Sequence, residues 1–199
     1  GNGERARRES SDALSILTQM LESGMDERLA IKSVNSVLML RSPEEVYATV
    51  DLAVVDLYSG KATFMKIGSA PSFLKRGREV RIISAQNLPI GILQDIEVDS
   101  IVLQLAPGDV LFMMTDGVLD ALGHTVNKEL WMKRMLSELD CDSPQEAADR
   151  LLSAVVRSGG GTIADDMTIV AARVGKYAPE WATFRRPHAE DIDRPRIVS

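Results

Sequence analysis

The spacing of hydrophobic positions changes along the chain and divides it into three parts. Over residues 13–38 apolar side chains recur at three- and four-residue steps, which is typical of amphipathic helices. Over residues 46–114 short β-branched and apolar runs are separated by turn residues, which indicates strands. Helical spacing returns over 130–139 and 147–155, and a last apolar run, 169–172, predicts a final strand.

The first part predicts a helical hairpin, with Gly24 ending one helix and Asp26 capping the next. Each helix is expected to carry one apolar stripe that can pack on the core or on a partner: Ala13, Leu14, Leu17, Met20 and Leu21 in the first helix and Leu29, Ala30, Val34, Val37 and Leu38 in the second. In the middle part, turns are predicted at Ser59-Gly60, Arg76-Gly77-Arg78 and Pro107-Gly108-Asp109. Helices, then antiparallel strands, then helices and a strand predict an α+β fold.

At 199 residues the chain is long enough for one domain with a sizeable core, which we place at residues 1–175. Residues 176–199 form a Pro- and Arg-rich tail that we expect to be mobile. The net charge of −6 argues against nucleic acid as a partner. No apolar run approaches the roughly 20 residues that cross a bilayer, and the single cysteine, Cys141, excludes an internal disulfide.

Two aspartates lie at the ends of expected buried strands. Asp116 closely follows the apolar run 110–114, and Asp165 precedes the run 169–172. Carboxylates are hard oxygen ligands suited to Mg²⁺ or Mn²⁺. If the fold brings the two within about 4 Å, they repel by about 4 kcal/mol at an effective dielectric near 20. Either one then takes up a proton, as in acid proteases, or a divalent cation neutralises both; the residues alone leave both alternatives open.

Six short segments together resemble one family of bacterial enzymes. They are Gly1-Asn2-Gly3-Glu4-Arg5-Ala6, Val34-Asn35-Ser36-Val37-Leu38, Lys66-Ile67-Gly68-Ser69-Ala70-Pro71-Ser72, Leu88-Pro89-Ile90-Gly91-Ile92-Leu93, Thr115-Asp116-Gly117-Val118-Leu119-Asp120-Ala121 and Asp165-Asp166-Met167-Thr168. Over residues 1–175 the chain is similar to the phosphatase domains of the stage II sporulation protein E family, members of the metal-dependent PPM (PP2C-like) serine/threonine phosphatases. This resemblance implies an αββα sandwich of two antiparallel sheets flanked by helices.

The resemblance also implies a site and a reaction. Asp116 and Asp165 match the family's metal ligands and catalytic residues, on two Mn²⁺ or Mg²⁺ ions whose bridging hydroxide attacks a phosphoserine or phosphothreonine ester. Gly117 is expected to permit a tight turn, Asp166 to support the ligands from outside, and Thr168 to hydrogen-bond nearby. The segments Gly68–Pro71 and Leu88–Gly91 are interpreted as structural turns.

The chain begins without a methionine at Gly1-Asn2-Gly3, so we expect a piece of a longer protein. In the family, an Asp-Gly pair just before this point bridges both metals, and the fold begins with further strands. The 199-residue chain is therefore expected to be inactive or nearly so, with doubtful metal occupancy. Missing strands would leave a sheet edge open, which predicts self-association as a dimer or strand-swapped assembly.

The implied partner is a phosphorylated anti-anti-sigma factor, whose dephosphorylation activates a sporulation sigma factor. The implied location is a cytoplasmic domain of a membrane-anchored bacterial protein, joined to the membrane through other parts of the parent chain. The alternative is a non-catalytic regulatory or interaction domain with the same fold. The net negative charge and the small number of aromatic residues argue against a nucleic-acid-binding domain.

Overall fold

The computed structural model describes residues 4–41, 47–123, 125, 127–141, 143–160 and 165–175. In chain order the elements are α1 Glu4–Glu22, α2 Glu27–Arg41, β1 Val50–Val55, β2 Lys61–Ile67, β3 Ser72–Arg76, β4 Glu79–Ile83, β5 Ile101–Gln104, β6 Val110–Met114, α3 Asp116–Asp120, α4 Lys128–Glu138, α5 Pro144–Ser158 and β7 Ile169–Arg173.

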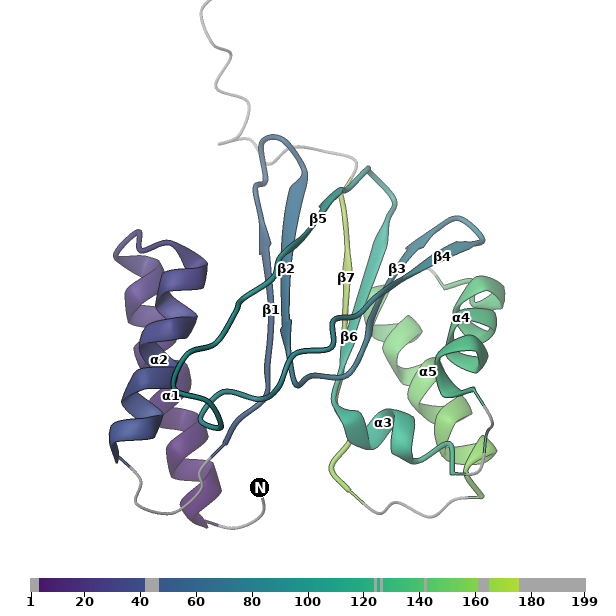
Figure 1. Cartoon of the computed structure of the whole chain (residues 1–199). Coiled ribbons are helices and arrows are strands. Elements are labelled where there is room, and N and C mark those ends of the chain that lie inside the picture. Colours follow the sequence, from purple (N-terminus) through teal and green to yellow (C-terminus); the bar gives the residue numbers. More distant parts are fainter. Residues whose placement is uncertain are drawn as a thin grey trace, which may run out of the picture.

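The strands form two antiparallel sheets that pack face to face. One sheet has the order β1-β2-β5 and the other β4-β3-β6-β7. Helices α1 and α2 cover the outer side of the first sheet, and α4 and α5 cover the second (Figure 1). This arrangement confirms the predicted α+β class and the two helix-flanked antiparallel sheets.

The side chains of β2 alternate between its two faces, so this one strand contributes to two hydrophobic clusters. Ala62 and Phe64 point between the sheets, where they pack with Leu74 and Leu111. Residues 65 and 67, on the other face, pack against α1 and α2. Because side chains alternate with a period of two, a strand that is covered on both sides buries side chains on both faces, and this accounts for the burial of Ala62 and of residues 64–67.

Lys66 is a charged residue in the space between the sheets, and the sequence analysis did not predict its role. It is 0 % exposed. Its Nζ donates to Asp51 Oδ2 at 2.6 Å and to Ser72 Oγ at 2.8 Å. Desolvation lowers the pKa of Lys66, while the hydrogen bond and charge of Asp51 act in the opposite direction. These bonds join β1 and β2 of the first sheet to β3 of the second.

Most predicted elements are confirmed, with local corrections. Turns occur at all three predicted positions, where Gly60, Gly77 and Gly108 adopt positive φ. Within the two predicted apolar stripes, Leu14 and Leu29 are 65 % and 54 % exposed, so these two side chains do not pack on the core of this chain. The short helix α3 was not predicted.

Two parts of the sequence analysis fall outside the described residues: the 176–199 tail and Gly1-Asn2-Gly3. Within the described ranges no helix combines the length and the apolar character needed to cross a membrane.

Candidate metal centre

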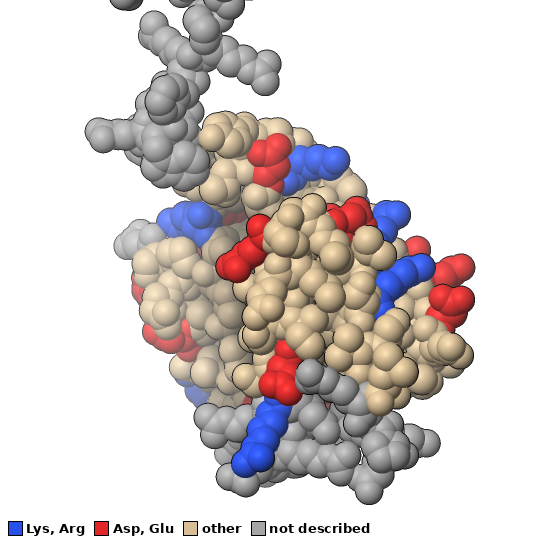
Figure 2. All heavy atoms as spheres, turned by 90° about the vertical axis from the view of Figure 1, so that its left-hand side faces the viewer, with Lys and Arg blue, Asp and Glu red and all other residues tan. Residues whose placement is uncertain are grey.

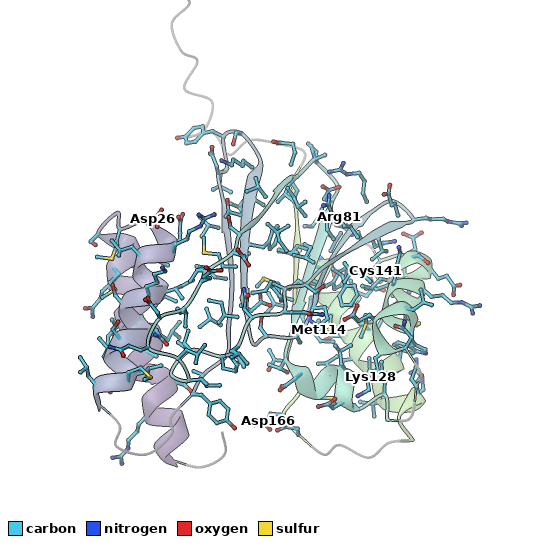
Figure 3. The ribbon with its side chains drawn as sticks, viewed as in Figure 1. Asp26, Arg81, Met114, Lys128, Cys141 and Asp166 are labelled. Carbon is cyan, nitrogen blue, oxygen red and sulfur yellow. The ribbon has the colours of Figure 1, made fainter. Side chains whose placement is uncertain are left out.

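The two candidate aspartates approach each other because β6 and β7 are neighbours. The strands pair antiparallel, with Met114 opposite Ile169. The chain leaving β6 and the chain entering β7 therefore lie at the same edge of the sheet. Asp116 follows β6 and Asp165 precedes β7, so both come to this edge, where Figure 3 labels Asp166 below α3.

Thr115 holds the two segments together beyond the sheet. Its amide donates to the carbonyl of Thr168 at 3.1 Å, and its hydroxyl accepts from the amide of Thr168 at 2.9 Å. The hydroxyl also donates to the carbonyl of Asp166 at 3.2 Å. Thr168, a predicted supporting residue, thus makes these hydrogen bonds with its main-chain amide and carbonyl. The side chain that makes the contacts belongs to Thr115, which the sequence analysis missed although it immediately precedes the candidate ligand.

Gly117 is required at its position for a reason that differs from the predicted one. It lies inside α3 and does not adopt positive φ, so the expected tight turn is wrong. Instead, a Cβ on residue 117 would lie 2.5 Å from the Asp166 carbonyl oxygen and 3.4 Å from Asp165 Cβ. Only glycine allows the start of α3 to approach the segment that carries Asp165 so closely.

Each candidate carboxylate is oriented by the amide that follows it. Gly117 N donates to Asp116 Oδ1 at 3.0 Å, and Asp166 N donates to Asp165 Oδ1 at 2.8 Å. Both carboxylates are exposed, and no cation pairs with either among the residues that the structure describes. Exposed oxygen donors held by backbone amides suit a hard divalent cation. No group of three or more His, Cys, Asp or Glu side chains in the described ranges is placed to hold a metal.

A cleft of about 640 Å³ opens beside Asp116. Its lining residues are Gly68, Ser69, Ala70, Asp116, Leu119, Asp120, Thr125, Asn127, Lys128 and Glu129. Lys128 Nζ lies 2.8 Å from Asp120 Oδ1. The segment 68–70 is a turn, as predicted, and it is also a wall of this cleft, which the sequence analysis did not foresee.

Residues 88–91, the second segment interpreted as a turn, lie next to residues 68–70 and help to position this wall of the cleft. Gly68 has φ +62°, and a Cβ there would lie 2.6 Å from Pro89 Cγ. The amide of Gly68 donates to the carbonyl of Asn87 at 2.9 Å. Next to it, the buried hydroxyl of Ser69 has no hydrogen-bond partner within the described part of the chain. Loop 87–91 therefore sets the position of the cleft wall.

Comparisons with known proteins agree with this architecture. The family model for stage II sporulation protein E (SpoIIE) matches residues 1–175. The chain is 46% identical to stage II sporulation protein E of Bacillus subtilis (strain 168), over 94% of this chain and 23% of the relative. It is 48% identical to the same-named protein of Priestia megaterium, over 92% of this chain and 32% of the relative. A more distant relative, phosphoserine phosphatase RsbU of Bacillus subtilis (strain 168), is 22% identical over 76% of this chain and 46% of its own length.

Solved structures show the same fold. The PP2C phosphatase domain of SpoIIE from Bacillus subtilis, solved with a fragment of its regulatory domain, matches with a TM-score of 0.80 and 46% identity, covering 87% of this chain and 52% of that one. A manganese-presoaked structure of the SpoIIE phosphatase domain from Bacillus subtilis matches with a TM-score of 0.65 and 42% identity. The match covers 85% of this chain and 76% of that one. The chain spans about a quarter to a third of the two sporulation relatives. It belongs to the stage II sporulation protein E family, in the part that corresponds to the PP2C phosphatase domain.

Proposed function

We propose that this domain is a metal-dependent protein serine/threonine phosphatase that removes phosphate from a phosphoserine of an anti-anti-sigma factor and so activates a sporulation sigma factor. The observation that carries the proposal is the juxtaposition of Asp116 and Asp165, produced by β6–β7 pairing and by the contact of Gly117 with Asp166. Family membership supports the reaction class. The relative RsbU is named a phosphoserine phosphatase, which supports the substrate class.

Asp116 and Asp165 would hold Mn²⁺ or Mg²⁺, with two ions in the intact domain. When bound, such ions lower the pKa of a water molecule and neutralise the charge of a phosphate ester, which is the chemistry that phosphoserine hydrolysis needs. The chain's own contribution is orientation: the amides of Gly117 and Asp166 fix one oxygen of each carboxylate. Thr115 and Asp166 hold the two ligand-bearing segments at a constant separation.

The cleft beside Asp116 would receive the phosphorylated segment. Lys128 is the only cationic residue among those that line it within the described ranges. Its ammonium group pairs with the exposed carboxylate of Asp120, so an incoming phosphate would compete with Asp120 for a charge-assisted hydrogen bond from Lys128. A small, open cleft suits a phosphoserine on a flexible chain, in keeping with a protein substrate.

Two further proposals concern assembly and location. We propose that the domain self-associates, because large apolar side chains of α1 and α2, Leu14 and Leu29 among them, are exposed. We also propose that it is a cytoplasmic domain whose membrane anchor lies elsewhere in the parent chain, as the family resemblance implies.

One observation favours a different function. The described residues contain two candidate ligands and no group of three, so a regulatory or interaction domain that has kept the fold without turnover is the alternative. Such a domain would use the cleft or the exposed helix face for binding, and its partner affinity would not depend on Mn²⁺.

The experiment is a Mn²⁺ titration by calorimetry, together with phosphate release from a phosphoserine peptide of the anti-anti-sigma factor. It compares the 199-residue chain with the longer natural chain that contains it. In the longer chain, Asp116→Asn and Asp165→Asn should each abolish phosphate release. Each should also weaken Mn²⁺ binding by more than about 100-fold, the upper end of the loss that outer-shell substitutions cause. Asp120→Asn, in the same cleft, is the matched control and should keep Mn²⁺ affinity. Mn²⁺-independent peptide binding without phosphate release in the longer chain would support the alternative.

A further inference from the structure

The short connection between β2 and β3, residues 68–71, crosses from one sheet to the other beside the candidate metal centre. β2 ends at Ile67 in the first sheet, and β3 begins at Ser72 in the second. Residues 68–70 line the cleft of about 640 Å³ together with Asp116, and in Figure 1 the connection lies at the same end of the sheets as α3. The bonds that fix the two ends of this connection therefore fix one wall of the cleft.

Both ends of the connection are held by hydrogen bonds. At the β2 end, the amide of Gly68 donates to the carbonyl of Asn87 at 2.9 Å, and Asn87 Nδ2 donates to the carbonyl of Lys66 at 3.3 Å. At the β3 end, the Ser72 hydroxyl accepts from Lys66 Nζ at 2.8 Å and donates to Asp51 Oδ2 at 3.1 Å. Lys66 thus holds one end through its main chain and the other end through its side chain.

Asp51, Lys66 and Ser72 form a buried network in which one carboxylate oxygen makes all the contacts. Lys66 and Ser72 are both 0 % exposed, and Lys66 Nζ lies 2.6 Å from Asp51 Oδ2. The same oxygen accepts from Ser72, whereas Asp51 Oδ1 is buried and accepts no hydrogen bond from the described part of the chain. A buried ion pair is a weak source of stability, and an unpaired buried oxygen lowers stability. The contacts of Asp51 therefore favour the position of Ser72 over the stability of the ion pair.

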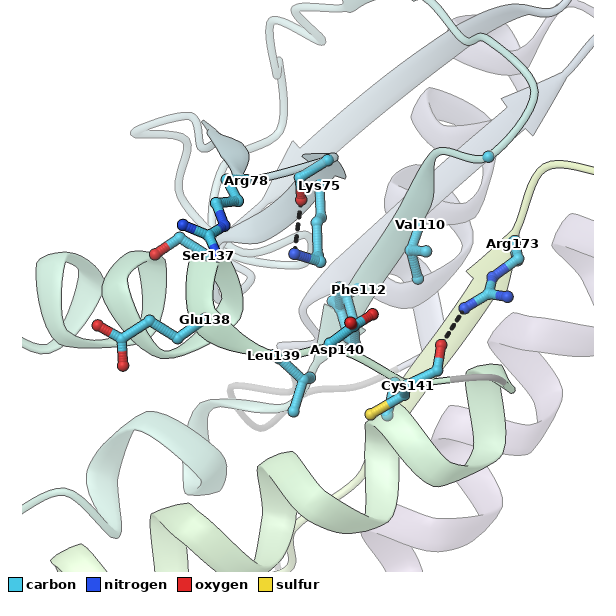
Figure 4. Close-up of a pocket in the computed structure, with 13 residues that line it drawn as sticks. Lys75, Arg78, Val110, Phe112, Ser137, Glu138, Leu139, Asp140, Cys141 and Arg173 are labelled. Carbon is cyan, nitrogen blue, oxygen red and sulfur yellow. Dashed lines mark hydrogen bonds between the residues drawn. The ribbon is translucent and has the colours of Figure 1, made fainter.

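A second buried carboxylate, at the far end of the strands, is paired differently. Asp109 precedes β6, whereas Asp116 follows it. Both oxygens of Asp109 accept hydrogen bonds, Oδ1 from Arg76 Nε at 2.8 Å and Oδ2 from Arg76 Nη2 at 2.7 Å and from Ala106 N at 2.8 Å. A separate cavity of about 350 Å³ lies at this end, where Val110 begins β6 (Figure 4). Asp109 is thus fully paired and does not line the cleft beside Asp116, so it supplies a matched control.

We propose that Ser72 is a positioning residue for phosphoserine hydrolysis: Lys66 and Asp51 hold its hydroxyl, and Ser72 in turn holds residues 68–70 in place beside Asp116. This inference rests on the proposed phosphatase function. The phosphorylated segment occupies the cleft that residues 68–70 line, so a wall that shifts away loses contact with the substrate. The cleft then binds the substrate less tightly, which raises KM.

The metal ligands do not depend on the buried network. The amides of Gly117 and Asp166 orient the carboxylates of Asp116 and Asp165, and Thr115 joins the two segments that carry them. None of these bonds involves a residue of the buried network. A weakened wall should therefore change KM while kcat and the Mn²⁺ affinity stay close to those of the wild type.

Ser72→Ala tests the proposal directly, because it removes the hydroxyl and leaves the ion pair of Lys66 with Asp51 in place. In the longer natural chain, with Mn²⁺ and the phosphoserine peptide, this variant should raise KM by about 2- to 10-fold, the equivalent of one hydrogen bond. Hydrogen exchange over residues 68–72 should become faster, in the 199-residue chain as well. The control Asp109→Asn should lower the urea midpoint and leave both KM and the exchange over residues 68–72 unchanged.

A double variant separates positioning from stability. Lys66→Met together with Asp51→Val replaces the ion pair with apolar side chains of similar size, a change that is often neutral or stabilising. Ser72 then keeps its hydroxyl but loses both partners. The urea midpoint should stay near that of the wild type, while KM rises as it does in Ser72→Ala. If the network were only structural, KM would follow the urea midpoint across all these variants.

Three results would overturn the proposal: a wild-type KM in Ser72→Ala, an equal rise of KM in Asp109→Asn, or a fall of Mn²⁺ affinity in Ser72→Ala in place of the rise of KM. If the longer chain releases no phosphate, the proposed function fails and the role of Ser72 in hydrolysis fails with it. Hydrogen exchange then still shows whether Ser72 holds the wall, since unchanged exchange over residues 68–72 in Ser72→Ala would exclude that contribution in either chain.

Discussion

Gly117 lies against the main chain of Asp166, so closely that a Cβ on residue 117 would be 2.5 Å from the Asp166 carbonyl oxygen. The same carbonyl accepts a hydrogen bond from the Thr115 hydroxyl at 3.2 Å. The start of α3 and the segment before β7 are thus joined by this steric contact and by the three hydrogen bonds of Thr115 to Asp166 and Thr168. Asp116 and Asp165, one on each segment, depend on this junction for their relative position.

We therefore predict that Gly117→Ala displaces the segment 165–168. The added methyl meets backbone, which cannot rotate away, so overpacking should destabilise the fold by about 1–3 kcal/mol, partly offset by up to about 1 kcal/mol of helix propensity. Mn²⁺ affinity should fall by more than the stability change alone explains. Urea unfolding and calorimetric Mn²⁺ titration measure the two effects.

Asp120→Ala is the control for this prediction, because it changes the same helix at an exposed position. Its pair with Lys128 is at the surface, so the stability change should stay within about 1 kcal/mol. If Gly117→Ala keeps wild-type Mn²⁺ affinity, the junction does not position the two aspartates as argued here.

The sequence was sufficient to place both aspartates at strand ends but not to bring them together. The apolar runs 110–114 and 169–172 end near recognisable polar residues, and both runs lie in strands, β6 and β7. The approach of Asp116 to Asp165 requires the pairing of Met114 with Ile169. These residues are far apart in the chain, and no local pattern specifies which strands become neighbours.

Lys66 and α3 show two other reasons why prediction failed. Alternation along β2 places position 66 on the inner face, but a lysine is rarely fully buried unless paired, and its partners Asp51 and Ser72 lie on other strands. Helix α3 has five residues, too few to produce a helical period that a sequence pattern can reveal.

Asn35 provides a second prediction, about how α2 holds the loop after β4. It is 1 % exposed; its side chain accepts from Gly91 N at 2.7 Å and donates to the carbonyls of Leu93 and Gln94 at 3.0 and 3.3 Å. Asn35→Ala leaves these backbone groups unpaired and should cost about 2–3 kcal/mol. Hydrogen exchange at 91–94 should become faster.

Ser36→Ala is the neighbouring control. The Ser36 hydroxyl is exposed and bonds only within α2, to the carbonyl of Lys32 at 3.1 Å, so its removal should change stability by less than about 0.5 kcal/mol. Unchanged exchange at 91–94 in Asn35→Ala would show that other contacts hold the loop.

The pair of Arg76 with Asp109 gives a prediction for pH. Asp109 is 1 % exposed and accepts two hydrogen bonds from Arg76, at 2.7 and 2.8 Å, and one from Ala106 N. Burial raises the pKa of Asp109, but the bonds from Arg76 and Ala106 together outweigh it, so the pKa lies below the ordinary 3.8. A lowered carboxyl pKa stabilises the fold above the unfolded pKa, and this stabilisation is lost as the pH falls through the folded pKa.

Asp109→Asn should therefore destabilise the protein by about 1–3 kcal/mol near pH 7, and the difference from wild type should narrow below about pH 4. Urea unfolding at a series of pH values measures this difference in the free energy of unfolding. Glu138→Gln is the control, since its pair with Arg134 is 67% and 82% exposed and should contribute little. A difference that stays constant down to pH 3 would contradict the assigned pKa direction.

The outer face of α1 and α2 gives the last prediction. Leu14, Leu29, Met39 and Leu40 are 65, 54, 38 and 87 % exposed, and Figure 2 shows a broad area on this side of the molecule without charged side chains. Exposed large apolar side chains favour association with another chain, so the double variant Leu14→Glu, Leu29→Glu should shift a dimer toward monomer in analytical ultracentrifugation at micromolar concentration. Val170→Lys instead places a charge on the edge strand β7, where Val170 is 55 % exposed. If only Val170→Lys dissociates the dimer, the chains associate through the open edge of the sheet. A wild-type chain that is monomeric at every concentration tested would rule out association through the helices and through the sheet edge.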